Sequence, residues 1–72
     1  MDDGADINWV DFRGNSSLHY ATIAGLESIV DLLLKRGANV NLENNYKKKP
    51  IEMAQTNNHY SIVKKLIDIG AK

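Results

Sequence analysis

Ser16, Ser17 and His19 are the side chains in this sequence whose types and spacing could support nucleophilic catalysis. A histidine close to a serine can act as the general base that activates the hydroxyl. That chemistry also needs a group that orients the imidazole and an oxyanion hole. Asp11 is the nearest acid, and the surrounding residues do not resemble the strand-to-helix turn that holds many catalytic serines.

The alternative interpretation places the same side chains at the start of a helix. A serine at an N-cap accepts a backbone N–H, and a polar side chain three residues later can reach back to the cap. Ser16 and His19 have this spacing. We therefore favour a pair that resembles a capping box, and we expect no catalytic residue.

Composition argues against several other classes of site. The chain has no cysteine, and its two histidines lie far apart in the sequence, so we expect no disulfide, no metal site and no cofactor. The formal net charge is zero, so we expect neither nucleic acid nor a membrane as a partner. The run Lys47–Lys49 could form a small basic patch, although such runs are more often solvated loops. The longest mainly apolar run, IVDLLL, is too short to span a bilayer.

Two helices are predicted around the serine–histidine segment. Ser16 caps a short helix that ends before Gly25. A second helix, about 27–36, carries its apolar residues at helical spacing and stops at Gly37. The segment that follows, ANVNLENN, has the composition of a hairpin-like connection.

A second pair of helices follows the same plan with changes. Pro50 occupies the first helical position, and Lys49 before it is a poor N-cap. Asn58 stands at the turn between the helices, where it tolerates a left-handed conformation. On the outer side of the earlier helix, Asp31 and Lys35 are spaced for an ion pair.

The chain repeats itself with a period of 33 residues. The dipeptide Gly-Ala recurs at positions 4–5, 37–38 and 70–71, and the tripeptide Ser-Ile-Val recurs at 28–30 and 61–63. A fixed period of this length is the sequence signature of a repeat architecture.

A 33-residue unit of a turn and two helices that ends in G-A-x-V-N resembles the ankyrin repeat. The first unit matches the family pattern at Asp11, Gly14, Leu18, His19, Ala21, Gly25, Ile29, Val30, Leu33, Leu34, Gly37, Ala38, Val40 and Asn41. The second unit keeps Pro50, Ala54, His59, Ile62, Val63, Leu66, Gly70 and Ala71. The departures are Ser16-Ser17 for Thr-Pro, Leu26 for histidine, Lys47 for glycine and Glu52 for the motif histidine. By analogy with the family's motif histidine, His59 is expected to brace the structure.

The resemblance implies an all-α, ankyrin-repeat solenoid of helix-turn-helix units joined by hairpin-like loops. We divide the chain into 1–10, the tail of a preceding repeat, 11–43, the first repeat, and 44–72, a degenerate and capping-like second repeat. In the last unit Lys65 replaces Leu32, and a charge there suits a face turned to water.

Proteins similar to this one bind other proteins through their hairpin tips and the concave face of their inner helices. The resemblance therefore implies a non-catalytic protein–protein interaction module, whose partner the sequence does not identify. The candidate partner-binding residues are Trp9, Phe12, Arg13, Tyr20, Ile23, Asn45, Tyr46, Met53 and Thr56. Aromatic residues and arginine are enriched at interface hot spots. As an alternative, Trp9 and Phe12 could cover the open end of the first unit.

Two further interpretations follow from the repeat architecture. The chain could cap or space a longer array without a partner site of its own. It could also self-associate through an uncapped N-terminal face, on which Leu18, Ile29 and Leu33 would be partly uncovered. Because about three repeats are normally needed for stability, we predict that these 72 residues are marginally stable unless they self-associate. The absence of cysteine and of a signal-like N-terminus favours an intracellular location, in the cytoplasm or nucleus.

Overall fold

The computed structural model describes residues 7–71, and four helices make up the regular structure within that range. They are α1 (Ser17–Ala24), α2 (Glu27–Lys35), α3 (Pro50–Thr56) and α4 (Tyr60–Ile69). Val10 and Ser16 form an isolated antiparallel bridge. The prediction of an all-α fold is therefore confirmed. Residues 1–6, which belong to the predicted tail of a preceding repeat, lie outside the described residues.

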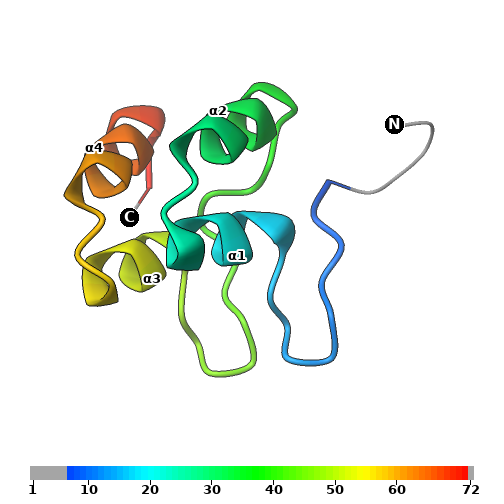
Figure 1. Cartoon of the computed structure of the whole chain (residues 1–72). Coiled ribbons are helices and arrows are strands. Elements are labelled where there is room, and N and C mark those ends of the chain that lie inside the picture. Colours follow the sequence, from blue (N-terminus) through cyan, green and yellow to red (C-terminus); the bar gives the residue numbers. More distant parts are fainter. Residues whose placement is uncertain (1–6, 72) are drawn as a thin grey trace.

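The helices form two helix-turn-helix pairs that lie side by side (Figure 1). Helix α1 packs against α2 and α3, and α3 packs against α4. We call α1 and α3 the inner helices, and α2 and α4 the outer helices. The segments before the two inner helices project on the same side of the molecule (Figure 1). We call residues 9–15 loop 1 and residues 42–48 loop 2.

The ends of the first helix pair follow the predicted local chemistry. Ser16 is the N-cap of α1 and forms a capping box with His19, and Gly25 ends the helix at φ 74°. Helix α2 has Glu27 in its first turn and Lys35 in its last turn, each with the charge that the helix dipole favours there. Gly37 follows α2 at φ 86°, as the sequence predicted.

The second helix pair reaches the same geometry with different residues. Pro50 is the first residue of α3, as predicted. Lys49 provides no side-chain cap, but the Glu52 carboxylate accepts the Lys49 backbone N–H at 3.1 Å. Glu52 thus takes over the part of the capping box that the motif histidine performs in the first unit. Asn58 has φ 62°, which confirms the left-handed turn predicted at this position.

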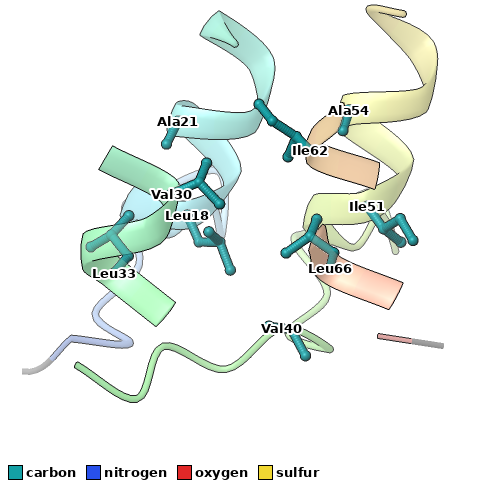
Figure 2. Packing of buried hydrophobic residues seen from close by; sticks show 9 residues of the cluster. All are labelled: Leu18, Ala21, Val30, Leu33, Val40, Ile51, Ala54, Ile62 and Leu66. Carbon is teal, nitrogen blue, oxygen red and sulfur yellow. The ribbon is translucent and has the colours of Figure 1, made fainter. Parts of the chain in front are cut away.

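One hydrophobic cluster runs through both helix pairs (Figure 2). Its buried residues are Leu18, Ala21, Val30, Leu33, Val40, Ile51, Ala54, Ile62 and Leu66. Every helix contributes to it, and Val40 adds the segment that connects the pairs. The two pairs therefore share a single core and stabilise each other by burying the same apolar surface.

The prediction that three apolar residues would be partly uncovered at the N-terminal end was wrong for two of them. Leu18 and Leu33 are buried, at 1% and 8% exposure, because their side chains enter the shared cluster (Figure 2). Ile29 is 43% exposed as expected. Its counterpart one period later, Ile62, is only 1% exposed because it lies in that cluster.

The charges on the outer helices are arranged differently from the sequence prediction. Asp31 pairs with Lys65 of α4, at 3.1 Å between carboxylate and ammonium, and not with Lys35 of its own helix. The prediction that Lys65 is turned away toward water was also wrong, because its side chain reaches back to the first helix pair. The ion pair is partly exposed, so its contribution to stability is small.

Candidate protein-binding surface

Loop 1 is organised around the carboxylate of Asp11. Oδ1 accepts the backbone N–H groups of Arg13 and Asn15, at 2.9 and 3.0 Å. Oδ2 accepts the hydroxyl of Tyr20 from α1. The Tyr20 hydrogen bond is the largest effect on the pKa of Asp11, which lies below its ordinary value of 3.8. Burial is the next largest effect and opposes the lowering, while the Asn15 and Arg13 N–H groups and the Arg13 charge lower the pKa further. The tip of loop 1 is therefore fixed to the first inner helix.

Loop 2 repeats this turn with an amide in place of the carboxylate. Asn44 occupies the position that corresponds to Asp11, and its Oδ1 accepts the N–H groups of Tyr46 and Lys48 at 2.8 and 3.0 Å. Unlike a carboxylate, the amide also has a donor. Its Nδ2 donates to Oδ1 of Asn15 in loop 1 at 2.8 Å, and both side chains are buried.

Asn45 joins the tips of the two loops. Its backbone N–H donates to the Arg13 carbonyl at 3.0 Å, and its side-chain amide donates to the Phe12 carbonyl at 2.8 Å. The loops approach so closely that a Cβ at Gly14 would lie 2.6 Å from the Asn45 side-chain oxygen. Two tips that the sequence places 33 residues apart therefore form one continuous surface.

The aromatic candidates of the loops are exposed. Phe12 and Tyr46 are 84% and 67% exposed, and the Arg13 guanidinium lies over the Phe12 ring at 5.4 Å from its centroid. Trp9 is also 67% exposed. With these exposures, neither Trp9 nor Phe12 covers the end of the first helix pair, so the alternative role for them was wrong.

The candidates on the inner helices occupy matching positions of α1 and α3. Tyr20 corresponds to Met53 in the 33-residue register, and Ile23 corresponds to Thr56. Tyr20 and Ile23 are 44% and 36% exposed, Met53 is half-buried and Thr56 is exposed. The structure therefore brings eight of the nine candidates together in two groups, one at the loop tips and one on the inner helices. Trp9 belongs to neither group, because it precedes the Val10–Ser16 bridge at the base of loop 1. The hydrogen bond from Tyr20 to Asp11 links the two groups.

His19, the catalytic candidate, is fully buried and both of its ring nitrogens have backbone partners. Nδ1 accepts the Ser16 N–H at 3.1 Å and lies 2.9 Å from the Ser16 hydroxyl. Nε2 lies 2.9 Å from the carbonyl oxygen of Lys48 in loop 2, so the tautomer protonated at Nε2 satisfies both sides. The predicted capping role is confirmed. The contact with loop 2 was not foreseen, because sequence spacing does not show which carbonyl a ring nitrogen will meet.

His59 also braces the structure, in a different way from His19. Its Nε2 lies 3.2 Å from the Ile23 carbonyl at the end of α1, so the ring connects the two helix pairs. A Cβ at Gly25 would lie 2.6 Å from this ring, which explains why the turn between α1 and α2 has no side chain. His59 is therefore a brace, but the expectation that it has the same role as His19 was wrong, because its side chain does not cap α4.

Sequence reasoning missed one exposed aromatic side chain. Tyr60, the first residue of α4, is 67% exposed, and its hydroxyl donates to Asn58 at 2.8 Å. It lies outside both groups of candidates. Its exposure could have been inferred only from the orientation of α4.

Stacked helix-turn-helix pairs with projecting loops define a helical repeat protein of the solenoid class. The family model described as ankyrin repeats (3 copies) matches residues 1–72, so the chain belongs to the ankyrin-repeat family. Ankyrin repeats are generally protein-interaction modules, and the family is typically non-enzymatic.

Curated relatives from several animals match the chain. It is 38% identical to human "Ankyrin repeat and IBR domain-containing protein 1" over 55 residues. These residues make up 76% of the chain and 5% of that protein. It is 39% identical over 70 residues to the chicken "Nuclear factor NF-kappa-B p105 subunit", covering 93% of the chain and 7% of that protein. A third relative is the Drosophila melanogaster "ARF GTPase-activating protein Git", 36% identical over 66 residues, which cover 90% of the chain and 9% of that protein. The chain spans less than a tenth of the length of each.

Residues 7–71 contain neither a membrane-spanning helix nor a group of metal ligands. None of the helices in this range combines the length and the apolar character needed to cross a membrane. Within the same residues, no three His, Cys, Asp or Glu side chains are grouped so that they could hold a metal ion.

Proposed function

We propose that this chain binds a partner protein through the tips of its two loops and the exposed side of its inner helices. The observation that carries this proposal is the exposure of Phe12 and Tyr46 on tips that hydrogen bonds hold in place. Large aromatic side chains on a rigid surface give contact area at a low entropic cost, as binding hot spots require. In this proposal, residues 1–10 are the tail of a preceding repeat, residues 11–43 are the first repeat and residues 44–72 are the second repeat.

The test compares two tyrosines with the same exposure. Tyr46 lies on the proposed surface and Tyr60 lies off it, and both are 67% exposed. The chain is used to capture proteins from an extract of the source organism, and each captured protein is purified and titrated against the variants by calorimetry. We expect Tyr46→Ala and Phe12→Ala to weaken binding about tenfold or more, and Tyr60→Ala to leave it within about twofold. Equal losses for Tyr46→Ala and Tyr60→Ala would contradict the proposal.

A second function is favoured by the apolar residues at the N-terminal end of the helix pairs. Leu26 and Ile29 are 51% and 43% exposed, whereas the corresponding His59 and Ile62 lie against the first helix pair. Leu26 and Ile29 thus form an end surface on the first pair. This surface corresponds to the one through which the second pair stacks on the first. We propose that it stacks against a further helix pair, either in a longer array that this chain caps or spaces, or from a second copy.

Sedimentation velocity over a range of concentrations tests stacking against a second copy. We expect the sedimentation coefficient to rise with concentration, and Ile29→Glu to abolish the rise because a charge cannot be buried in an apolar contact. Thr56→Glu adds the same charge on an exposed site away from this end. A monomer at every concentration would exclude self-association.

A further inference from the structure

We propose that the loop tips form a basic and aromatic surface that binds an acidic segment of the partner protein. This inference rests on the proposed function and names the chemistry of its partner. We call Phe12, Arg13, Asn45, Tyr46 and Lys47 the tip surface. No single loop forms it, because the first two residues come from loop 1 and the other three from loop 2.

The tip surface is set in place before any partner arrives. Asn45 donates hydrogen bonds to the Phe12 and Arg13 carbonyls. Within each loop, the side chain of Asp11 or Asn44 accepts two backbone N–H groups and fixes the turn. A surface held by hydrogen bonds loses little conformational freedom on binding, so more of the contact energy contributes to affinity.

The side chains on this surface suit carboxylates beside apolar groups. Arg13 is exposed and lies over the exposed Phe12 ring. A guanidinium stacked in this way is oriented and can form paired hydrogen bonds with a carboxylate. Tyr46 adds a second exposed ring, and Lys47 adds an exposed cation beside it.

The two loops carry a small net positive charge although the whole chain is neutral. The basic residues of the two loops are Arg13, Lys47 and Lys48, and the acidic ones are Asp11 and Glu43. The Asp11 carboxylate accepts three hydrogen bonds from within the chain. Lys48 lies 3.8 Å from the Glu52 carboxylate. The hydrogen bonds to Asp11 leave its negative charge in place, and Glu52 offsets Lys48. The attraction for an acidic partner therefore comes from Arg13 and Lys47, the two cations of the tip surface, and it acts at short range.

A protein segment fits this surface better than a nucleic acid does. Nucleic acids bind through many phosphate contacts along an extended basic surface. Here the tip surface holds two cations, Arg13 and Lys47, Glu43 of loop 2 is exposed, and the formal net charge of the chain is zero. A short segment with acidic and aromatic residues matches both the size and the chemistry of the surface.

The experiment uses a fluorescent copolymer of glutamate and tyrosine as the probe, with the full chain labelled for NMR. We expect the probe to bind the chain and to shift the backbone amide signals of the tip surface. We also expect added salt to weaken this binding. The double variant Arg13→Gln/Lys47→Gln removes two positive charges and should weaken binding about tenfold. The matched control Lys35→Gln/Lys64→Gln removes two positive charges from the exposed outer helices and should change binding less than about twofold.

Three results would overturn the inference. The first is no binding of the copolymer by the folded chain. The second is an equal loss of binding in both double variants, which would show attraction to charge in general. The third is tighter binding of oligothymidylate than of the copolymer, which would assign the surface to nucleic acid. If any of these occurs while Tyr46→Ala still weakens a captured partner, the acidic chemistry is wrong and the proposed function stands. If Tyr46→Ala leaves every captured partner unaffected, the proposed function itself fails.

Discussion

At the scale of single residues, His19 and Asp11 show how polar side chains support a small helical protein. His19 lies in the first inner helix and Asp11 lies before it, and each pairs with backbone groups of the loops or of the helix cap. His19 does so in the interior, where a lost hydrogen bond is costly. Asp11 does so at the surface, where the effect is seen in its pKa.

We expect His19→Ala to lower the free energy of unfolding by about 2–4 kcal/mol, because it removes the acceptor of the Ser16 N–H, one of the two hydrogen bonds to the Lys48 carbonyl, and a buried ring. Urea unfolding followed by circular dichroism measures the change. Tyr46→Ala, at an exposed site, should change stability by no more than about 0.5 kcal/mol. A His19→Ala variant as stable as the parent chain would show that the ring is not a brace.

Tyr20→Phe should raise the pKa of Asp11 toward its ordinary value, because the hydroxyl is the largest cause of the lowering. A carboxyl whose pKa is lowered by folding adds stability above its unfolded pKa and loses that contribution as the pH falls through the folded value. The contribution of Asp11 is therefore present above about pH 4 and disappears below it. An NMR titration of the Asp11 carboxyl carbon checks this. An identical titration curve in Tyr20→Phe would show that the hydroxyl does not interact with the carboxylate.

At the scale of elements, the loops contain one backbone conformation that their sequence does not favour. Lys47 has φ 61°, and glycine occupies the corresponding position of loop 1, at φ 78°. Lys47→Gly should raise the free energy of unfolding by about 0.5–1 kcal/mol. A residue with a side chain is strained in the left-handed backbone conformation, and this strain exceeds the entropic cost of glycine. Thermal unfolding measures the shift. Lys47→Ala removes the charge but keeps the Cβ, so stabilisation by Lys47→Ala as well would point to charge as the cause.

The opposite change at Gly14 should separate the two loops. A side chain there would be strained at φ 78°, and its Cβ would lie 2.7 Å from the Asn45 backbone nitrogen. We expect Gly14→Ala to cost about 1–3 kcal/mol and to increase hydrogen exchange at the Asn45 amide. Gly37→Ala is a suitable comparison, because that glycine has a positive φ but no neighbour within 4 Å of a Cβ. Equal exchange at Asn45 in both variants would contradict the close approach.

The elements themselves were predictable, whereas the contacts between them were not. Local signals placed all four helices: the Ser16 cap, the glycine stops, the proline start and the 33-residue period. The pairing of Asp31 with Lys65, and of the Asn45 amide with the Phe12 carbonyl, joins positions about one period apart. Such contacts depend on how one helix pair is displaced relative to the next, and spacing along a single unit contains no information about that displacement. Helical spacing therefore suggested Lys35 as the partner of Asp31, and the structure corrects it.

At the scale of the whole molecule, the shared core sets the stability. Within residues 7–71, the buried residues of the hydrophobic cluster come from both pairs, and the exposed Leu26 and Ile29 leave apolar surface unburied at one end. We expect the monomer to unfold at low urea with a free energy below about 3–5 kcal/mol. Equilibrium urea unfolding of a dilute sample measures this value. A cooperative transition of larger free energy would show that two helix pairs need no neighbour.

The contacts at the junction of the helix pairs also give the chain a direction. His59 reaches back to Ile23, Lys65 to Asp31, and Asn45 to Phe12. At the equivalent positions the first unit has Leu26, Leu32 and Phe12, which offer no polar side-chain atom. A chain with its two units in the opposite order would keep the apolar stacking and lose these polar links. The 33-residue units are therefore similar in shape but not interchangeable, and their order is encoded in the side chains at the junction.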